Sequence, residues 1–154
     1  MQALAIRRRT HGDEHPDTLV SMNHLASTYR RQGKSKEAEE LQTQALDISK
    51  RLFGESHQYT LFSTNNLVLI YLEQERWEEA EVLIIDALVV ETAVLSQEHQ
   101  YTLTSLSNLA SVYRYQKRWE ECEDLEIKLL DMHKRIFGEE HRHVKHHDQS
   151  GNNI

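Results

Sequence analysis

Apolar residues recur every three or four positions along most of the chain. In the first third, one such set is Leu19, Met22, Leu25, Ala26 and Tyr29, and a second, after a short break, is Ala38, Leu41, Ala45, Ile48 and Leu52. Each set falls on one face of an α-helix. The same pair of patterns returns twice, so we predict an all-α protein with helices at about 16–32, 35–52, 58–74, 77–93, 100–116 and 119–135.

The pattern repeats with a period of 42 residues. At that offset, eleven columns are identical in three successive blocks, among them His15/His57/His99, Thr18/Thr60/Thr102 and Tyr29/Tyr71/Tyr113, and the column Ala38/Ala80/Cys122 stays small. Because a single two-helix hairpin cannot bury both of its apolar faces, we expect the hairpins to stack. We predict a partial repeat with only a second helix (1–11), three full repeats (12–53, 54–95 and 96–137), and a degenerate repeat leading into a disordered histidine-rich tail (138–154).

Within this column set, Leu25-Ala26, Tyr29, Ala38, Leu41 and Ala45 resemble the tetratricopeptide repeat (TPR). The 42-residue period, with His15 to Leu19 opening the first helix and Glu37-Ala38-Glu39 opening the second, is most similar to the kinesin-light-chain type. Similar arrays also form the sensor regions of NB-ARC/NLR-type receptors. The resemblance implies an α-solenoid, a right-handed superhelix whose first helices line a concave groove, and it implies no catalytic chemistry.

Carried over residue by residue, the resemblance places ten candidate ligand contacts in that groove: Asn23, Ser27, Arg30, Arg31, Phe62, Asn65, Leu69, Thr104, Ser107 and Arg114. Amides can bond a peptide backbone, arginines can bind carboxylates, and Phe62 with Leu69 can hold an apolar side chain. We therefore expect a protein or peptide partner with acidic character. The alternative is that the polar groups are solvated and the arginines pair with neighbouring acids.

Composition excludes several other partners. The 154 residues carry a formal charge of −7, which argues against nucleic acid, and no apolar run of about 18 residues predicts a membrane span. One cysteine cannot form an internal disulfide, and the N-terminus lacks a signal-peptide pattern. We expect a cytoplasmic protein.

Four features could be mistaken for chemical sites. The tail histidines His141, His143, His146 and His147 lie in a polar segment, and the column His15/His57/His99 holds one residue per repeat, which suits a structural role at each turn. Cys122 occupies the small column, which predicts a buried thiol. Trp77 and Trp119 recur 42 residues apart, which predicts a packing position. We expect no catalytic residue, no metal and no cofactor.

Two functions fit these expectations. The first is a non-enzymatic interaction module that binds a peptide or protein segment in the concave groove. The alternative is a structural fragment of a longer TPR array, such as the sensor region of an NB-ARC-type receptor, that mainly contacts its own flanking repeats. The mid-repeat start and the absence of a polar capping helix favour the alternative, which predicts self-association through exposed ends.

Overall fold

The computed structural model describes residues 2–96 and 99–148, and describes side chains as far as residue 136. This part of the chain contains seven helices and no strand, which confirms the all-α prediction. None of these helices has both the length and the apolar composition that crossing a bilayer requires. The helices are α1 (Gln2–His11), α2 (Pro16–Arg31), α3 (Ser35–Phe53), α4 (Gln58–Glu73), α5 (Trp77–Val94), α6 (Gln100–Tyr115) and α7 (Trp119–Asp148).

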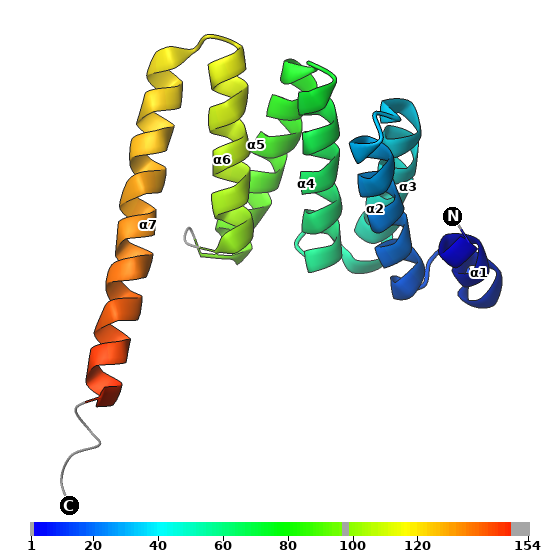
Figure 1. Ribbon diagram of the computed structural model, residues 1–154, viewed down its shortest axis with the longest axis horizontal. Coiled ribbons are helices and arrows are strands. Elements are labelled where there is room, and N and C mark those ends of the chain that lie inside the picture. The colour runs from blue at the N-terminus through cyan, green and yellow to red at the C-terminus, as the bar shows by residue number, and fades with distance from the viewer. Residues whose placement is uncertain (1, 97–98, 149–154) are drawn as a thin grey trace, which may run out of the picture.

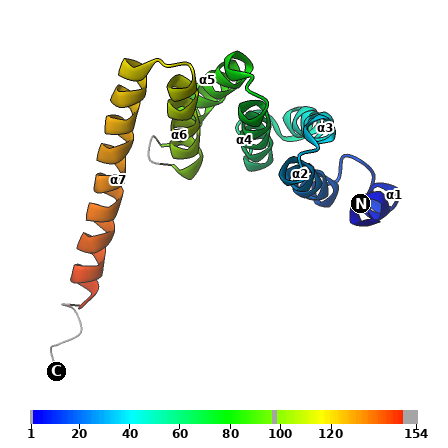
Figure 2. The same ribbon diagram turned by 45° about the horizontal axis from the view of Figure 1, so that its top comes forward.

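The helices stack in chain order into an arch (Figures 1 and 2). Each helix packs on the next one, and in addition α2 contacts α4 and α4 contacts α6, whereas α3, α5 and α7 do not contact one another. The stack is curved because the first helices of the hairpins touch one another whereas the second helices lie apart. The first helices α2, α4 and α6 therefore lie on its inner side. The architecture is the TPR-like solenoid expected of stacked hairpins.

The core consists of three clusters among the described side chains. Its central cluster joins Val68 of α4, Ala80 and Ile84 of α5, and Leu109 and Val112 of α6, all of them buried. The small column lets the helices approach closely, since Ala38 and Ala80 have no exposed surface and Cys122 is only 5% exposed. The predicted buried thiol is therefore confirmed.

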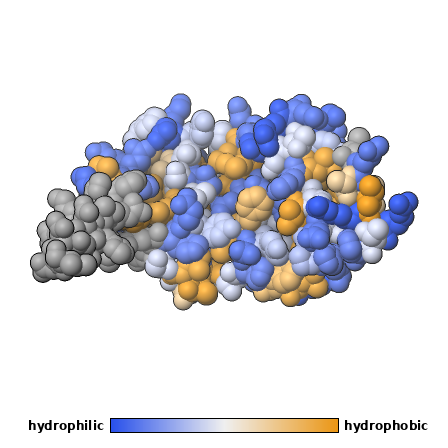
Figure 3. Space-filling view, turned by 60° about the horizontal axis from the view of Figure 1, so that its bottom comes forward, coloured by the Kyte–Doolittle hydropathy of each residue, from blue (hydrophilic) through white to orange (hydrophobic). Residues whose placement is uncertain are grey.

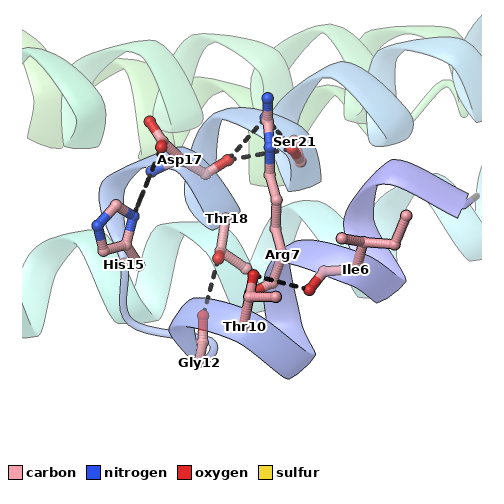
Figure 4. Close-up of polar contacts among 8 residues, drawn as sticks. All are labelled: Ile6, Arg7, Thr10, Gly12, His15, Asp17, Thr18 and Ser21. Carbon is pink, nitrogen blue, oxygen red and sulfur yellow. Dashed lines mark hydrogen bonds and ion pairs between the residues drawn. The ribbon is translucent and has the colours of Figure 1, made fainter.

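A histidine begins each first helix. Nδ1 of His15, His57 and His99 accepts a hydrogen bond from the backbone N–H two residues later, at 3.2 Å in all three helices. This is an N-cap, which satisfies one of the free N–H groups at a helix start. The threonine three residues later closes the preceding turn: Oγ1 of Thr18 donates to the Gly12 carbonyl at 2.8 Å (Figure 4). The structural role predicted for the histidine column is confirmed.

A second repeated contact joins each second helix to the following hairpin. Glu39 of α3 accepts hydrogen bonds from Arg76 at 2.7 Å and from Gln74 at 2.9 Å. The Arg76 guanidinium lies over the ring of Tyr71, 4.3 Å from its centroid. Glu81, Gln116, Arg118 and Tyr113 repeat the arrangement one block later, with the Arg118 guanidinium 4.1 Å from the Tyr113 ring.

The hydrogen bonds from Arg76 and Gln74 change the pKa of Glu39. Burial by itself would raise the pKa of Glu39, but the hydrogen bonds from Arg76 and Gln74 outweigh that effect and hold the pKa below its ordinary value. These hydrogen bonds therefore favour the charged form of the Glu39 carboxyl group. Tyr71 and Tyr113 both pack against the central core cluster, and each lies under the guanidinium of its own block.

The last helix differs from the prediction. The helix predicted to end near 135 continues as α7 to Asp148, so the segment 138–148, expected to begin a degenerate repeat and a disordered tail, is helical. The signals that end the earlier helices are missing here. Counting from Gly138, the places of Thr18 and Leu19 are taken by Val144 and Lys145, which cannot close the turn or start a new apolar face. Glycine alone costs a helix only about 1 kcal/mol. The end of the predicted tail, 149–154, lies outside the described residues.

Glu91 departs from the repeat, because it places a carboxyl group in the core. Its side chain is 1% exposed, and its counterpart in α3 is Ser49. Oε1 accepts a hydrogen bond from Ser105 of α6 at 3.0 Å, whereas Oε2 has no partner. Burial raises the pKa of Glu91, against a smaller opposite effect of the Ser105 hydrogen bond.

We predict that Glu91→Gln stabilises the protein at neutral and alkaline pH. A raised pKa in the folded state means that folded Glu91 keeps its proton to a higher pH than unfolded Glu91. The wild-type free energy of unfolding therefore falls as the pH rises from the ordinary value of 4.5 through the folded pKa. At about pH 8 the variant should be more stable by about 1 kcal/mol, and the difference should vanish toward about pH 4.

Urea denaturation across this pH range measures the effect. Glu78→Gln is the control, because Glu78 lies on the same helix but is exposed, so this change removes a charge that water already solvates. A variant that follows the wild-type pH profile would contradict the buried-charge explanation.

Candidate ligand-binding groove

The inner surface of the arch contains one hollow shared by the three first helices. Its volume is ≈ 210 Å³, and it lies at the N-terminal halves of α2, α4 and α6. Its walls are largely aromatic and are completed by small polar groups. The lining residues are Val20, Asn23, His24, Gln58, Tyr59, Phe62 and Tyr101.

Phe62 is the apolar centre of this hollow. Its side chain is 40% exposed although it lies on the inner face of α4, and the predicted groove column Val20/Phe62/Thr104 contributes two of the lining residues. Around it, Tyr59 contacts the His57 cap, with ring centroids 5.1 Å apart, and Tyr101 contacts the His99 cap at 5.6 Å. The helix caps thus hold two aromatic rings at the edge of the groove.

Val20 shares the predicted groove column of Phe62 and Thr104, but four lining residues lie outside the predicted columns: His24, Gln58, Tyr59 and Tyr101. A signal for two of them is present in the sequence. The column Asp17/Tyr59/Tyr101, two residues after the invariant histidine, changes from acidic to aromatic after the first repeat. A change of side-chain class in an otherwise regular column indicates a position that packing alone does not determine.

Asn23 corrects one of the predictions. It is 1% exposed, and its amide is occupied inside the fold: Nδ2 donates to the Leu19 carbonyl, and Oδ1 accepts from Gln42 at 2.6 Å and from Ser63 at 3.0 Å. Asn23 therefore joins α2, α3 and α4 and has no free group for a peptide backbone. Asn65 occupies the same column one block later and is half-buried, and the column of Gln42 holds Ile84 in that block.

The predicted arginines differ in their availability. Arg30 pairs with Glu73 of α4, and Arg114 pairs with Glu126 of α7, so both agree with the alternative of internal pairing. Arg31 is exposed, and its Nε makes a long hydrogen bond of 3.5 Å to the Ser27 carbonyl. Arg31 is therefore the predicted groove cation that has no carboxylate partner among the described residues.

The remaining predicted positions lie along the same inner faces. Ser107 is exposed, whereas Ser27, Leu69 and Thr104 are half-buried. The Thr104 hydroxyl donates to the Gln100 carbonyl at 2.8 Å, which leaves its oxygen free to accept. These residues could contact a ligand in the groove, but the hollow around Phe62 does not include them.

The features that could suggest chemistry are structural in the described part of the chain. The Cys122 thiol points at the Ala110 carbonyl, 3.4 Å away, and residues with described side chains contain no cluster of three metal-binding groups. The tail histidines lie beyond the described side chains. Trp77 stacks on Tyr115 of the next hairpin, with ring centroids 4.3 Å apart, which confirms its packing role.

Comparison with known proteins agrees with the repeat pattern. Family models described as tetratricopeptide repeat match residues 1–51, 36–88 and 102–143. No curated protein matches the sequence. Two crystal structures from Podosopora anserina show nearly identical TPR-like repeats of kinesin-light-chain type. Each is 27% identical to this chain over 86% of this chain and 63% of the other, and the TM-scores are 0.76 and 0.74.

A third solved structure shares the fold. BtubC (BKLC) from P. vanneervenii is 22% identical, with a TM-score of 0.80, over 89% of this chain and 55% of that protein. The chain thus spans less than two thirds of the length of these proteins. Because the family models cover most of the sequence and the helices stack in the same way, this chain belongs to the tetratricopeptide repeat family.

Proposed function

We propose that the inner face of α2, α4 and α6 binds an extended peptide segment of another protein, with an apolar side chain seated against Phe62. TPR repeats are generally protein-interaction modules, and folds of this type are typically non-enzymatic. The observation that supports this site is the hollow around Phe62, where a large apolar ring remains 40% exposed among two tyrosines. Apolar pockets with a few polar groups are the usual anchor sites of interfaces.

The positions of the free groups define the peptide further. Arg31 lies eleven residues after Val20 on α2, which is roughly 16 Å along the helix axis. An extended chain covers that distance in about five residues. A segment with an aromatic or branched apolar residue and an acidic residue about five positions away would therefore contact both the hollow and Arg31.

Selection of random 12-residue peptides against the whole chain tests this function. We expect the selected peptides to share the apolar and acidic pair, and Phe62→Thr to weaken their binding by at least about tenfold. Threonine stands in this column in the third repeat as Thr104, so the fold should tolerate the change. Arg31→Glu should remove the preference for acidic residues, and Thr43→Ala on the outer face of α3 is the control. Selected peptides that bind the Phe62 variant equally well would refute the groove.

A second function is supported by the outer end of the stack. Trp119, Glu123 and Leu130 of α7 occupy the columns of Trp77, Glu81 and Leu88, which the next hairpin covers. In α7, Trp119 is 61% exposed and Leu130 is 54% exposed, and Glu123 has no partner among the described residues. This face could receive a further repeat of a longer array. Light scattering should then show self-association that Trp119→Lys abolishes, and a monomer at high concentration would oppose this function.

A further inference from the structure

The outer face of α5 has valines at two positions where the equivalent faces of its neighbours are acidic. Val82, Ile85 and Val89 follow one another at helical spacing and are 62%, 42% and 65% exposed. Exposed hydrophobic residues reach the surface of the protein in separate patches among hydrophilic ones (Figure 3). We call this set of three residues the α5 stripe.

The internal repeat shows that the fold does not require an apolar stripe here. In the columns of Val82 and Val89, α3 has Glu40 and Asp47, and α7 has Asp124 and Asp131, all of them exposed. In the column of Ile85, α3 has Thr43 and α7 has Ile127, which is 53% exposed, so α5 differs from both neighbours at the two valines. Since neither packing nor helix formation explains the valines of α5, an interaction outside the chain is the remaining physical reason for an exposed apolar surface.

Two hollows border the stripe and give it relief. One, of ≈ 370 Å³, is lined by Leu67, Tyr71, Val82 and Leu83 together with Glu78, Glu79 and Asp86. The other, of ≈ 240 Å³, lies toward α3 and α4 and includes Val89. Leu83 and Asp86 line both hollows and so lie between them, whereas Val82 borders the first and Val89 the second. The stripe therefore has two depressions beside it that the side chains of a partner could enter.

The charges beside the stripe are negative. Glu79 is neutralised by Arg76, and Glu55 in the second hollow pairs with Lys50 at 3.3 Å. Glu78 and Asp86 have no ion-pair partner among the residues with described side chains, and both are exposed. A partner that covers the stripe would therefore bring its own cations next to these two carboxylates.

We propose that the α5 stripe binds a basic amphipathic helix of another protein, whose apolar side chains cover Val82, Ile85 and Val89 and whose lysines or arginines face Glu78 and Asp86. The stripe is about 10 Å long, which two turns of a crossing helix would cover. A second copy of this chain is disfavoured, because it would oppose like carboxylates across the contact and the chain carries a net charge of −7. An anionic membrane is disfavoured for the same reason. This surface lies on the opposite side of the hairpins from the groove around Phe62, and the proposal is independent of that groove.

Titration of the whole chain with an 18-residue leucine and lysine peptide, patterned as an amphipathic helix, tests the proposal. The double variant Val82→Glu/Val89→Asp should bind this peptide at least about tenfold more weakly than the wild type. It introduces the residue types that α3 already carries in these columns, and it adds two negative charges. General attraction between opposite charges would strengthen binding, so a loss identifies the apolar contact.

Two controls complete the design. A matched leucine and glutamate peptide should not bind the wild type, and Phe62→Thr should leave binding of the lysine peptide unchanged. If the acidic variant unfolds, Val82→Gln/Val89→Gln provides the same comparison without added charge. Unchanged or stronger binding by the folded variant would overturn the proposal. So would equal binding of the glutamate peptide, or a wild-type dimer in sedimentation that the variant dissociates.

Discussion

Ile84→Ala should lower the free energy of unfolding by about 2–5 kcal/mol. Ile84 is 1% exposed and lies at the centre of the cluster that joins α4, α5 and α6. Truncation removes buried methyl groups and leaves a cavity, because the helices around it are held by neighbours on both sides and cannot close on the gap. In a stack of hairpins this cluster is the contact between successive blocks, so the loss should affect the whole array and not α5 alone.

The next residue of the same helix is a matched control. Ile85 is 42% exposed, so Ile85→Ala removes the same atoms from a site that water already reaches, and it should change stability by less than about 1 kcal/mol. Urea denaturation followed by circular dichroism compares the two variants. Equal losses would mean that the central cluster does not have the packing described here.

The regular part of the fold could be predicted from the sequence because each position was observed three times. Six predicted helices end within one or two residues of the structure, apart from the C-terminus of α7. The exception has a local cause: Gly138 keeps its place in the repeat, but the threonine and leucine that would follow it are absent. A turn in this fold depends on the hydrogen bonds that close it, and glycine only permits it.

The groove was harder to predict, because repeat position fixes which way a residue points but not what it meets. Asn23 and Asn65 share a column, yet Asn23 is buried by Gln42 and Ser63, whereas Ile84 stands in the column of Gln42 in the next block. Likewise, Arg30 is paired because the following block offers Glu73. These outcomes depend on pairs of columns in adjacent blocks, which a column-by-column comparison does not examine.

The departures from the repeat are concentrated in one block. Val82 and Val89 on the outer face, Phe62 on the inner face and Glu91 in the core all lie between 54 and 95, the middle of the array. The contacts that stack the hairpins are kept in this same block, including the His57 cap and the bond from Arg76 to Glu39. The middle block therefore keeps the packing of its neighbours while its two open surfaces differ from theirs.

Ala80→Leu should destabilise the protein by about 1–3 kcal/mol, through overpacking. Ala80 has no exposed surface and lies between Val68, Ile84, Leu109 and Val112, so a larger side chain has to displace α4 or α6. The small column sets the distance between the helices. Leucine is nearly as good a helix former as alanine, so the loss would come from packing and not from helix propensity.

The repeat itself provides the graded comparison for this position. Ala80→Cys should cost less than about 1.5 kcal/mol, because Cys122 fills the equivalent site in the third block, and Ala93→Leu on the exposed side of α5 should have almost no effect. Thermal and urea denaturation of the three variants measures the series. Equal stability of Ala80→Leu and Ala93→Leu would contradict this explanation. Close approach of the helices would then not limit the size of the side chain at Ala80, and the helices would have to be farther apart than the buried core indicates.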